Sequence, residues 1–326
     1  MLIKHTPHSG VVTFSASPAI HFAMPHHRVF ACLGAIVAAL LSTACLAQQP
    51  DHLSMQPQDT SVYALPTPST ADEGANTGAV NIDIRVNYLT DYLYRGVDRT
   101  QFIDANTVGP IANERANFQF DGKLAWNLGK LPHPFIGIFA NVLDQDPVST
   151  FQEVRPTFGA EWRIRPLILS AGHNTYIFPD RSELNSGEGW GKIALDDSVL
   201  LRSDEPFLTP YIYAAYDYDI YNGWYFQAGV SHDFVIEGTG IYFTAEAAIG
   251  GVLGQQAFAG PTGKDGGLQH YEAGLTARYN LNQVLNIPNR YGQWSINGYL
   301  YYADGIDNKI RADTQLWGGA GIQFSY

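Results

Sequence analysis

The sequence predicts an all-β fold, an antiparallel transmembrane β-barrel of about twelve strands, and three observations predict it. From residue 80 onward, short segments that carry apolar residues at every second position follow one another along the chain. Charged residues make up 15 % of the sequence and aromatic residues 13 %, which suits strands with one face toward lipid. After the N-terminal region, no run of about 18 apolar residues predicts a membrane helix.

The N-terminal region has the pattern of an export signal. An apolar run over residues 29–41 follows Arg28, and this run is too short to span a bilayer. Small residues follow it and end at Ala47. We therefore expect a signal peptide over residues 1–47 that is cleaved after Ala47, with Met24 as an alternative start.

Both cysteines of the chain, Cys32 and Cys45, lie in this predicted signal. A mature chain without cysteine suits an oxidising compartment outside the cytoplasm. Lipidation of Cys45 is the alternative to simple cleavage, although Ser42 stands where lipoprotein signals usually carry a large aliphatic residue.

The rest of the chain divides into two parts. Residues 48–79 are rich in Pro, Ser, Thr and Gln and show no periodicity, so we expect a flexible periplasmic tail. Residues 80–326 form the predicted barrel domain. The formal net charge of −12 argues against a nucleic acid as partner.

The alternation gives the strands of the barrel. It is clearest where Phe118, Phe120 and Leu124 alternate with Gln119, Asp121 and Lys123. We expect strands near residues 81–95, 116–128, 134–143, 153–163, 166–176, 187–196, 208–219, 223–233, 240–250, 270–280, 293–300 and 314–326. Charges that are regularly opposed on neighbouring strands, with tyrosine and tryptophan near strand ends, favour this barrel over a soluble β-sandwich.

The connections between these segments alternate in length. Residues 128–133, 163–166 and 235–240 are short turns, as periplasmic turns of barrels are. Residues 96–113, 179–186, 253–267 and 303–313 are longer and polar, and we expect them on the extracellular side. Two predicted periplasmic connections, 197–207 and 281–291, are longer than expected, which indicates extra secondary structure or an error in the strand count.

The final segment, residues 314–326, alternates throughout except at Trp317 and ends on Tyr326. It is similar to the C-terminal insertion signal of bacterial outer-membrane barrels. This similarity implies an outer-membrane location, outer-membrane lipid as the surroundings, and the barrel-assembly machinery as a partner of the last strand.

A second resemblance concerns the first segment, where Thr90 to Gly96 read TDYLYRG. This string resembles the opening strand of a family of uncharacterised bacterial outer-membrane barrels with a TDYxYRG-type motif. Further matches stand, in the same order, at residues 176–179, 216–219, 223–225, 229–232 and 318–326. The resemblance implies an outer-membrane barrel and supplies neither a substrate nor an activity.

The predicted lumen face carries charges of both signs, and these are the candidate site residues. They are Asp83, Arg85, Asp121, Lys123, Glu153, Arg155, Glu161, Arg163, Glu246, Glu272 and Arg278. One hypothesis is a passive pore for small polar solutes. The other is a structural or adhesive barrel with a closed, salt-bridged interior, whose function lies in the loops at 96–113 and 253–267.

Enzymatic and metal-binding patterns are missing from the sequence. In Ser231-His232-Asp233 the serine and the acid share one face of the predicted strand and the histidine points away. His173 is followed by Asn174 and Thr175 without a nucleophilic serine. The histidines beyond the signal are widely separated, so we expect no enzyme, no metal site and no cofactor.

Overall fold

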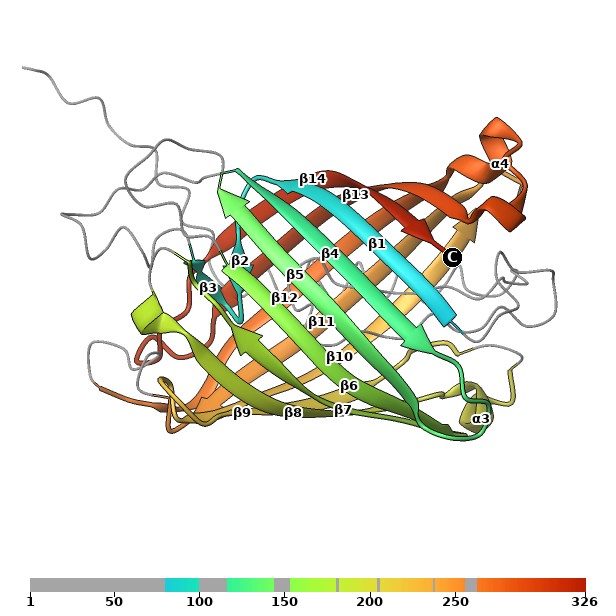
Figure 1. The fold of residues 1–326 in the computed structure, drawn as a ribbon. Helices are drawn as coiled ribbons and strands as arrows, with labels where there is room; N and C mark the ends of the chain where they lie inside the picture. Colours follow the sequence, from blue (N-terminus) through green and yellow to red (C-terminus); the bar gives the residue numbers. More distant parts are fainter. Residues whose placement is uncertain are drawn as a thin grey trace, which may run out of the picture. The chain divides into compact units, whose positions relative to one another are not determined.

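The computed structural model describes residues 80–99, 116–143, 153–179, 182–203, 206–236, 238–255 and 263–326. Twelve strands, each antiparallel to its neighbours, form one closed barrel (Figure 1), so the predicted fold class and strand number are confirmed. The expected signal peptide and the expected tail at 48–79 lie outside the described residues.

The barrel strands follow one another in space in the order of the sequence. They are β1 (Val80–Leu89), β4 (Asn117–Trp126), β5 (His133–Leu143), β6 (Glu153–Ile164), β7 (Leu167–Tyr176), β8 (Ser186–Leu195), β9 (Tyr211–Asp217), β10 (Gly223–Ile236), β11 (Ile241–Leu253), β12 (Gly266–Asn280), β13 (Gln293–Gly305) and β14 (Gln315–Ser325). The first and last strands close the barrel, with Asp83 opposite Ser325 and Leu89 opposite Gly319. Closure pairs the backbone groups of every strand, which is what a strand needs in order to cross hydrocarbon.

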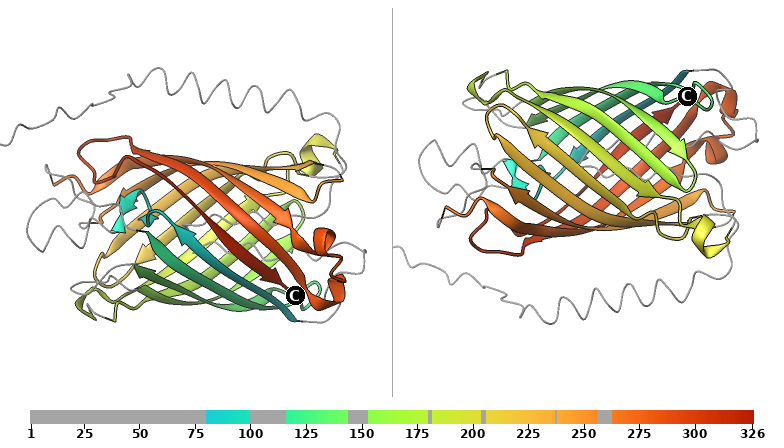
Figure 2. Two further views of the ribbon diagram at one scale, coloured as in Figure 1. Left: turned by 90° about the horizontal axis from the view of Figure 1, so that it is seen from above. Right: turned by 90° about the horizontal axis from the view of Figure 1, so that it is seen from below.

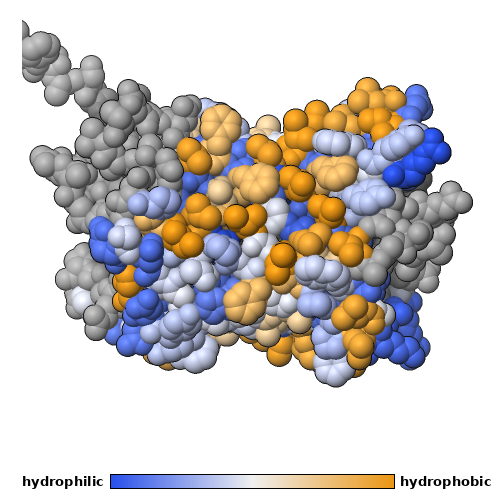
Figure 3. All heavy atoms as spheres, in the orientation of Figure 1, coloured by the Kyte–Doolittle hydropathy of each residue, from blue (hydrophilic) through white to orange (hydrophobic). Residues whose placement is uncertain are grey.

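Burial alternates along the strands as the sequence pattern predicts. On β1, Ile84, Val86 and Tyr88 are 36 to 48 % exposed, whereas Asp83 and Arg85 are 4 and 2 % exposed. On the face drawn in Figure 3, hydrophobic residues are spread over the outer surface of the strands, with polar residues among them. The outward parity therefore forms the lipid face and the inward parity forms the lumen wall. Among the described residues, no helix is long and apolar enough to cross a membrane.

Short helices occupy the two connections that were longer than expected. The first holds α3 (Ser198–Leu201), and the second holds α4 (Leu281–Leu285) with the 3-10 turn η3 (Asn289–Tyr291). Both lie at the end of the barrel that carries the C-terminus (Figure 2). The extra length is therefore secondary structure, and the strand count needs no change.

The first predicted strand, 81–95, is wrong in its second half. β1 ends at Leu89, and the chain then forms a small hairpin of β2 (Leu93–Tyr94) and β3 (Val97–Asp98) that is not part of the barrel sheet. Its turn residues, Arg95 and Gly96, have φ angles of 53° and 71°, the combination that a tight hairpin turn requires. The alternation of aromatic residues continues into the hairpin, so periodicity alone does not reveal where the strand ends.

A glycine on the inner face of β12 makes room for an aromatic ring. A Cβ atom built at Gly274 would lie inside the ring of Tyr301, whose hydroxyl bonds Glu246 and Thr276. We expect Gly274→Ala to lower the free energy of unfolding by about 1–3 kcal/mol, because Tyr301 must leave its position. Urea titration of the protein refolded in lipid vesicles measures this. Gly298→Ala on β13 is the control, since nothing lies within 4 Å of its Cβ and no loss is expected.

Candidate functional site in the barrel lumen

The hairpin of residues 91–99, hereafter the lumen hairpin, lies inside the barrel. Its side chains are between 0 and 7 % exposed. They pack in three apolar clusters with side chains of the surrounding strands, for example Leu93 with Trp317, Tyr92 with Phe139, and Val97 with Trp190. A side chain at position 96 would collide with His270 of β12, so glycine is needed for this close approach as well as for the turn.

Two parallel hydrogen bonds between Arg95 and Glu188 hold the tip of the lumen hairpin. Nη1 and Nη2 of Arg95 each donate to one carboxylate oxygen of Glu188 on β8, both at 2.9 Å. The guanidinium carbon lies 4.3 Å from the ring centroid of Tyr225 on β10. Both partners are almost completely buried, and a two-bond charged pair of this kind is among the strongest polar contacts in proteins.

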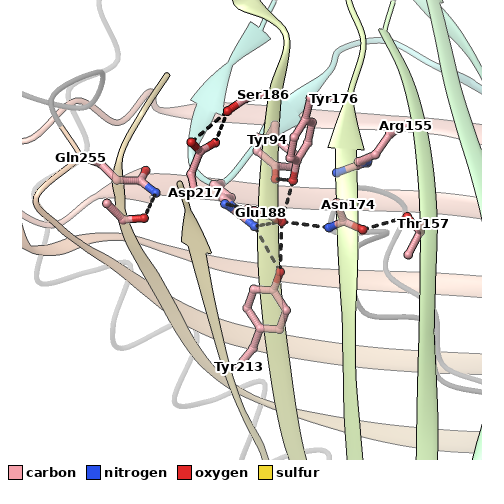
Figure 4. Close-up of polar contacts among 12 residues, drawn as sticks. Tyr94, Arg155, Thr157, Asn174, Tyr176, Ser186, Glu188, Tyr213, Asp217 and Gln255 are labelled. Carbon is pink, nitrogen blue, oxygen red and sulfur yellow. Dashed lines mark hydrogen bonds and ion pairs between the residues drawn. The ribbon is translucent and has the colours of Figure 1, made fainter. Parts of the chain in front are cut away.

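Neighbouring strands hold Glu188 in place. Its Oε1 accepts hydrogen bonds from Asn174 Nδ2 at 2.8 Å and from the Tyr176 hydroxyl at 2.7 Å, both on β7. Tyr213 of β9 also points toward it (Figure 4), and its hydroxyl accepts from Arg95 Nη2 at 3.2 Å. The carboxylate is thus oriented by donors from the wall, with one edge facing the hairpin.

Further polar contacts join the flanks of the hairpin to the wall. The hydroxyl of Tyr92 donates to Glu153 at 2.8 Å, and the backbone N–H of Asp98 donates to Asp313 at 2.8 Å. Gln315 of β14 donates to the Asp91 carboxylate. These contacts come from two parts of the barrel, the start of β6 and the segment that leads into β14, and hold both flanks of the hairpin.

Acidic residues gather where the lumen hairpin begins and ends. Burial is the main cause that raises the pKa of Asp91 to about 7, and the negative charge of Asp98 is the second. Hydrogen bonds from the Tyr92 N–H and from Gln315 lower this pKa and offset part of the rise. Burial also raises the pKa of Asp313, again with a contribution from Asp98. Asp91 lies in the connection between β1 and β2, outside the spanning strands. Its protonation therefore favours the docked hairpin at pH values below about 7.

The sequence-predicted site residues all lie on the inward parity of their strands. Nine are buried, with exposed fractions of 0 to 8 %: Asp83, Arg85, Asp121, Lys123, Glu153, Arg155, Glu161, Glu246 and Glu272. The other two, Arg163 and Arg278, are half-buried. Whether the set lines a path for solutes stays a prediction.

Charges of opposite sign face each other across the strand pairs of the lumen wall. Asp83 of β1 is opposite Lys123 of β4, and Arg85 is opposite Asp121. Within β6, Arg163 donates to Glu161 at 2.8 Å. Because these charges have neighbours of opposite sign, the wall can hold them in place away from bulk water.

The candidate site residues predicted from the sequence do not include Arg95 or Glu188. They are 93 residues apart, and no spacing rule joins them. The one local signal is the Arg95-Gly96 dipeptide inside a predicted strand, because glycine there indicates a turn.

The fold defines the class of this protein, a transmembrane β-barrel of the bacterial outer membrane.

No family model and no curated protein matches the chain, so the TDYxYRG-type family stays a prediction. Similar solved structures include the NanC porin (11 % identity, TM-score 0.42, covering 74 % of this chain and 98 % of that one). LpxR from Salmonella typhimurium has 12 % identity and a TM-score of 0.41, covering 74 % of this chain and 99 % of that one. The KdgM porin in complex with disordered oligogalacturonate has 7 % identity and a TM-score of 0.39, covering 76 % and 99 %. At this level the likenesses concern the fold alone.

Proposed function

We propose that this barrel is a channel for small polar solutes and that the lumen hairpin closes it in the conformation described. The observation that carries the proposal is the nature of the closure. Part of the connection between two strands lies inside the barrel, where polar contacts hold it in place. A hairpin that has only non-covalent contacts with the wall can leave the lumen without any change in strand pairing.

The wall beyond the hairpin suits polar solutes. Asp83, Arg85, Asp121 and Lys123 form a patch of mixed charge on β1 and β4. Glu272 of β12 adds a further carboxylate to the lumen wall. It accepts a hydrogen bond from the side chain of Gln227 on β10 at 2.9 Å. Rings of charged side chains set selectivity in channels, and the acid excess of the chain favours cations and neutral solutes.

The second candidate function is a structural or adhesive barrel with a permanently closed interior. The low exposure of the nine buried lumen charges favours it, since side chains that line an open aqueous path stay in contact with water. In that case the hairpin would be a fixed part of the core. Of the predicted functional loops, residues 100–113 of the first and 256–262 of the second lie outside the described residues. The expected contact of β14 with the barrel-assembly machinery stays a prediction.

Planar-bilayer conductance of the refolded full chain distinguishes the two candidates. We expect stepwise openings from the wild type, and a lower cation-to-anion permeability ratio in Glu272→Gln, because one inward negative charge is lost. The control is Glu183→Gln, an exposed acid in the connection between β7 and β8. Arg95→Ala is a variant with a weakened hairpin. If neither the wild type nor this variant shows any conductance, the closed structural barrel is supported.

The open fraction is expected to depend on pH. The docked state keeps a proton on Asp91 up to about pH 7, whereas an undocked carboxyl loses it near pH 4. Docking stability is therefore full below about pH 4 and falls as pH rises toward 7, so the open probability in single-channel records should rise over this window. Asp91→Asn should flatten most of this rise and leave the smaller contribution of Asp313. An equally steep pH dependence in Asp91→Asn would exclude Asp91 as its source.

A further inference from the structure

We propose that the lumen hairpin acts as a built-in ligand: the wall around Arg95 is a binding site for small solutes that carry a guanidinium group. This inference rests on the proposed channel function in one respect, that the hairpin can leave the lumen. The site itself, hereafter the Arg95 site, consists of Asn174, Tyr176, Glu188, Tyr213 and Tyr225.

The Arg95 site belongs to the barrel wall and not to the hairpin. Its five side chains come from four adjacent strands, β7 to β10, and are 0 to 3 % exposed. Asn174 Oδ1 in turn accepts a hydrogen bond from Thr157 of β6 at 2.8 Å (Figure 4). The backbone pairing that positions these residues does not involve the hairpin, and the hydrogen bonds of Glu188 with Asn174 and Tyr176 lie within the wall. The hairpin itself contributes the Tyr94 hydroxyl, which contacts that of Tyr176 at 2.5 Å.

The chemistry of the site is selective for a planar cation. Glu188 presents two oxygens to two nitrogens of one guanidinium, which donate two parallel hydrogen bonds. An ammonium group has a single nitrogen and cannot make this parallel pair. The face of Tyr225 lies against the same cation, at 4.3 Å, and Tyr213 lies 5.9 Å away. The buried carboxylate repels anions, which excludes acidic solutes from this position.

Arg155, an arginine of the wall that contacts the site, does not change this selection. Arg155 of β6 lies over the ring of Tyr176, with the guanidinium carbon 5.3 Å from the centroid, and its Nε is 3.5 Å from Glu153. Glu153 therefore balances Arg155, and Glu188 is left to balance the charge of Arg95.

Occupation of one site by either Arg95 or a solute couples binding to opening. A guanidinium solute binds only when Arg95 has left, so it shifts the equilibrium toward the undocked hairpin. The same contact that closes the lumen would then recognise the solute that opens it.

Chemical rescue of Arg95→Ala tests the site without depending on conduction. Isothermal titration calorimetry measures binding of methylguanidinium chloride to the full chain refolded in detergent, with sodium chloride and methylammonium chloride as reference salts. We expect Arg95→Ala to bind methylguanidinium more tightly than the wild type, whose own Arg95 competes. Adding Glu188→Gln should weaken that binding about tenfold or more, since the charged hydrogen bonds are lost.

Two further variants make the result decisive. Arg290→Ala removes an exposed arginine of η3 and should bind as the wild type does. Arg95→Ala with Tyr225→Leu keeps Glu188 and removes the ring, and a loss of affinity in this variant supports the site even if the Glu188 variant fails to fold. Equal binding of methylammonium and methylguanidinium, or equal binding with and without Glu188 and Tyr225, would overturn the proposal.

Conductance of the same variants separates this inference from the proposed function. If Arg95→Ala binds methylguanidinium but no variant conducts in bilayers, the Arg95 site is supported and the channel function is contradicted. Open channels whose Arg95→Ala variant neither binds methylguanidinium nor is blocked by it would leave the channel standing and remove the site.

Discussion

Arg95→Ala should convert rare openings of the barrel into long ones. The substitution leaves the Glu188 carboxylate buried, at 1 % exposure, without the guanidinium that balances it. Removal of one partner of a buried ion pair costs about 3–5 kcal/mol. If most of this free energy acts on hairpin docking, the ratio of open to closed states rises by about a hundredfold or more.

Single-channel recording in planar bilayers measures that ratio directly. Arg95→Lys is the informative intermediate, because an ammonium group keeps the charge but cannot make the two parallel hydrogen bonds with Glu188. Arg290→Ala controls for the loss of one arginine, since its side chain contacts only Tyr291 among the contacts described. An open probability in Arg95→Ala equal to that of Arg290→Ala would show that Arg95 does not hold the lumen closed.

The barrel was predictable because its signal is local and repeated. A strand that separates lipid from a polar lumen alternates between the two surroundings, and most of the twelve strands repeat the pattern. The inward parity of residues such as Asp121 and Arg155 follows from the same periodicity, and their burial agrees with it. Strand ends were less predictable: the expected 208–219 is Tyr211–Asp217, since turn and strand residues have similar composition there.

The lumen hairpin was not predictable from the same signal. Tyr92 and Tyr94 continue the parity of Tyr88, yet Tyr88 is 43 % exposed on the lipid face and the other two are buried inside. Aromatic residues fit both surroundings, so their spacing carries no information on which one they occupy. The decisive contact, Arg95 with Glu188, joins β8 to a turn far away in sequence and arises only when the barrel is closed.

Leu275→Arg should abolish membrane assembly of the barrel. Leu275 is 41 % exposed on the outward parity of β12, between Ala245 of β11 and Leu300 of β13. An arginine on the lipid face near the bilayer midplane costs about 2–4 kcal/mol, a large part of the stability of a small barrel. We expect the variant to stay unfolded or aggregated when the wild type folds into lipid vesicles.

Heat-modifiable migration on gels, together with protease protection in vesicles, reports the assembled fraction of Leu275→Arg. Leu285→Arg is the matched control, because it makes the same change at a leucine of α4 that is 61 % exposed in a connection outside the spanning strands. Leu275→Phe keeps the lipid face apolar and should assemble. The difference between the two arginine variants isolates the cost of a charge in hydrocarbon from any general effect of losing a leucine. Normal assembly of Leu275→Arg would mean that this position of β12 does not contact lipid.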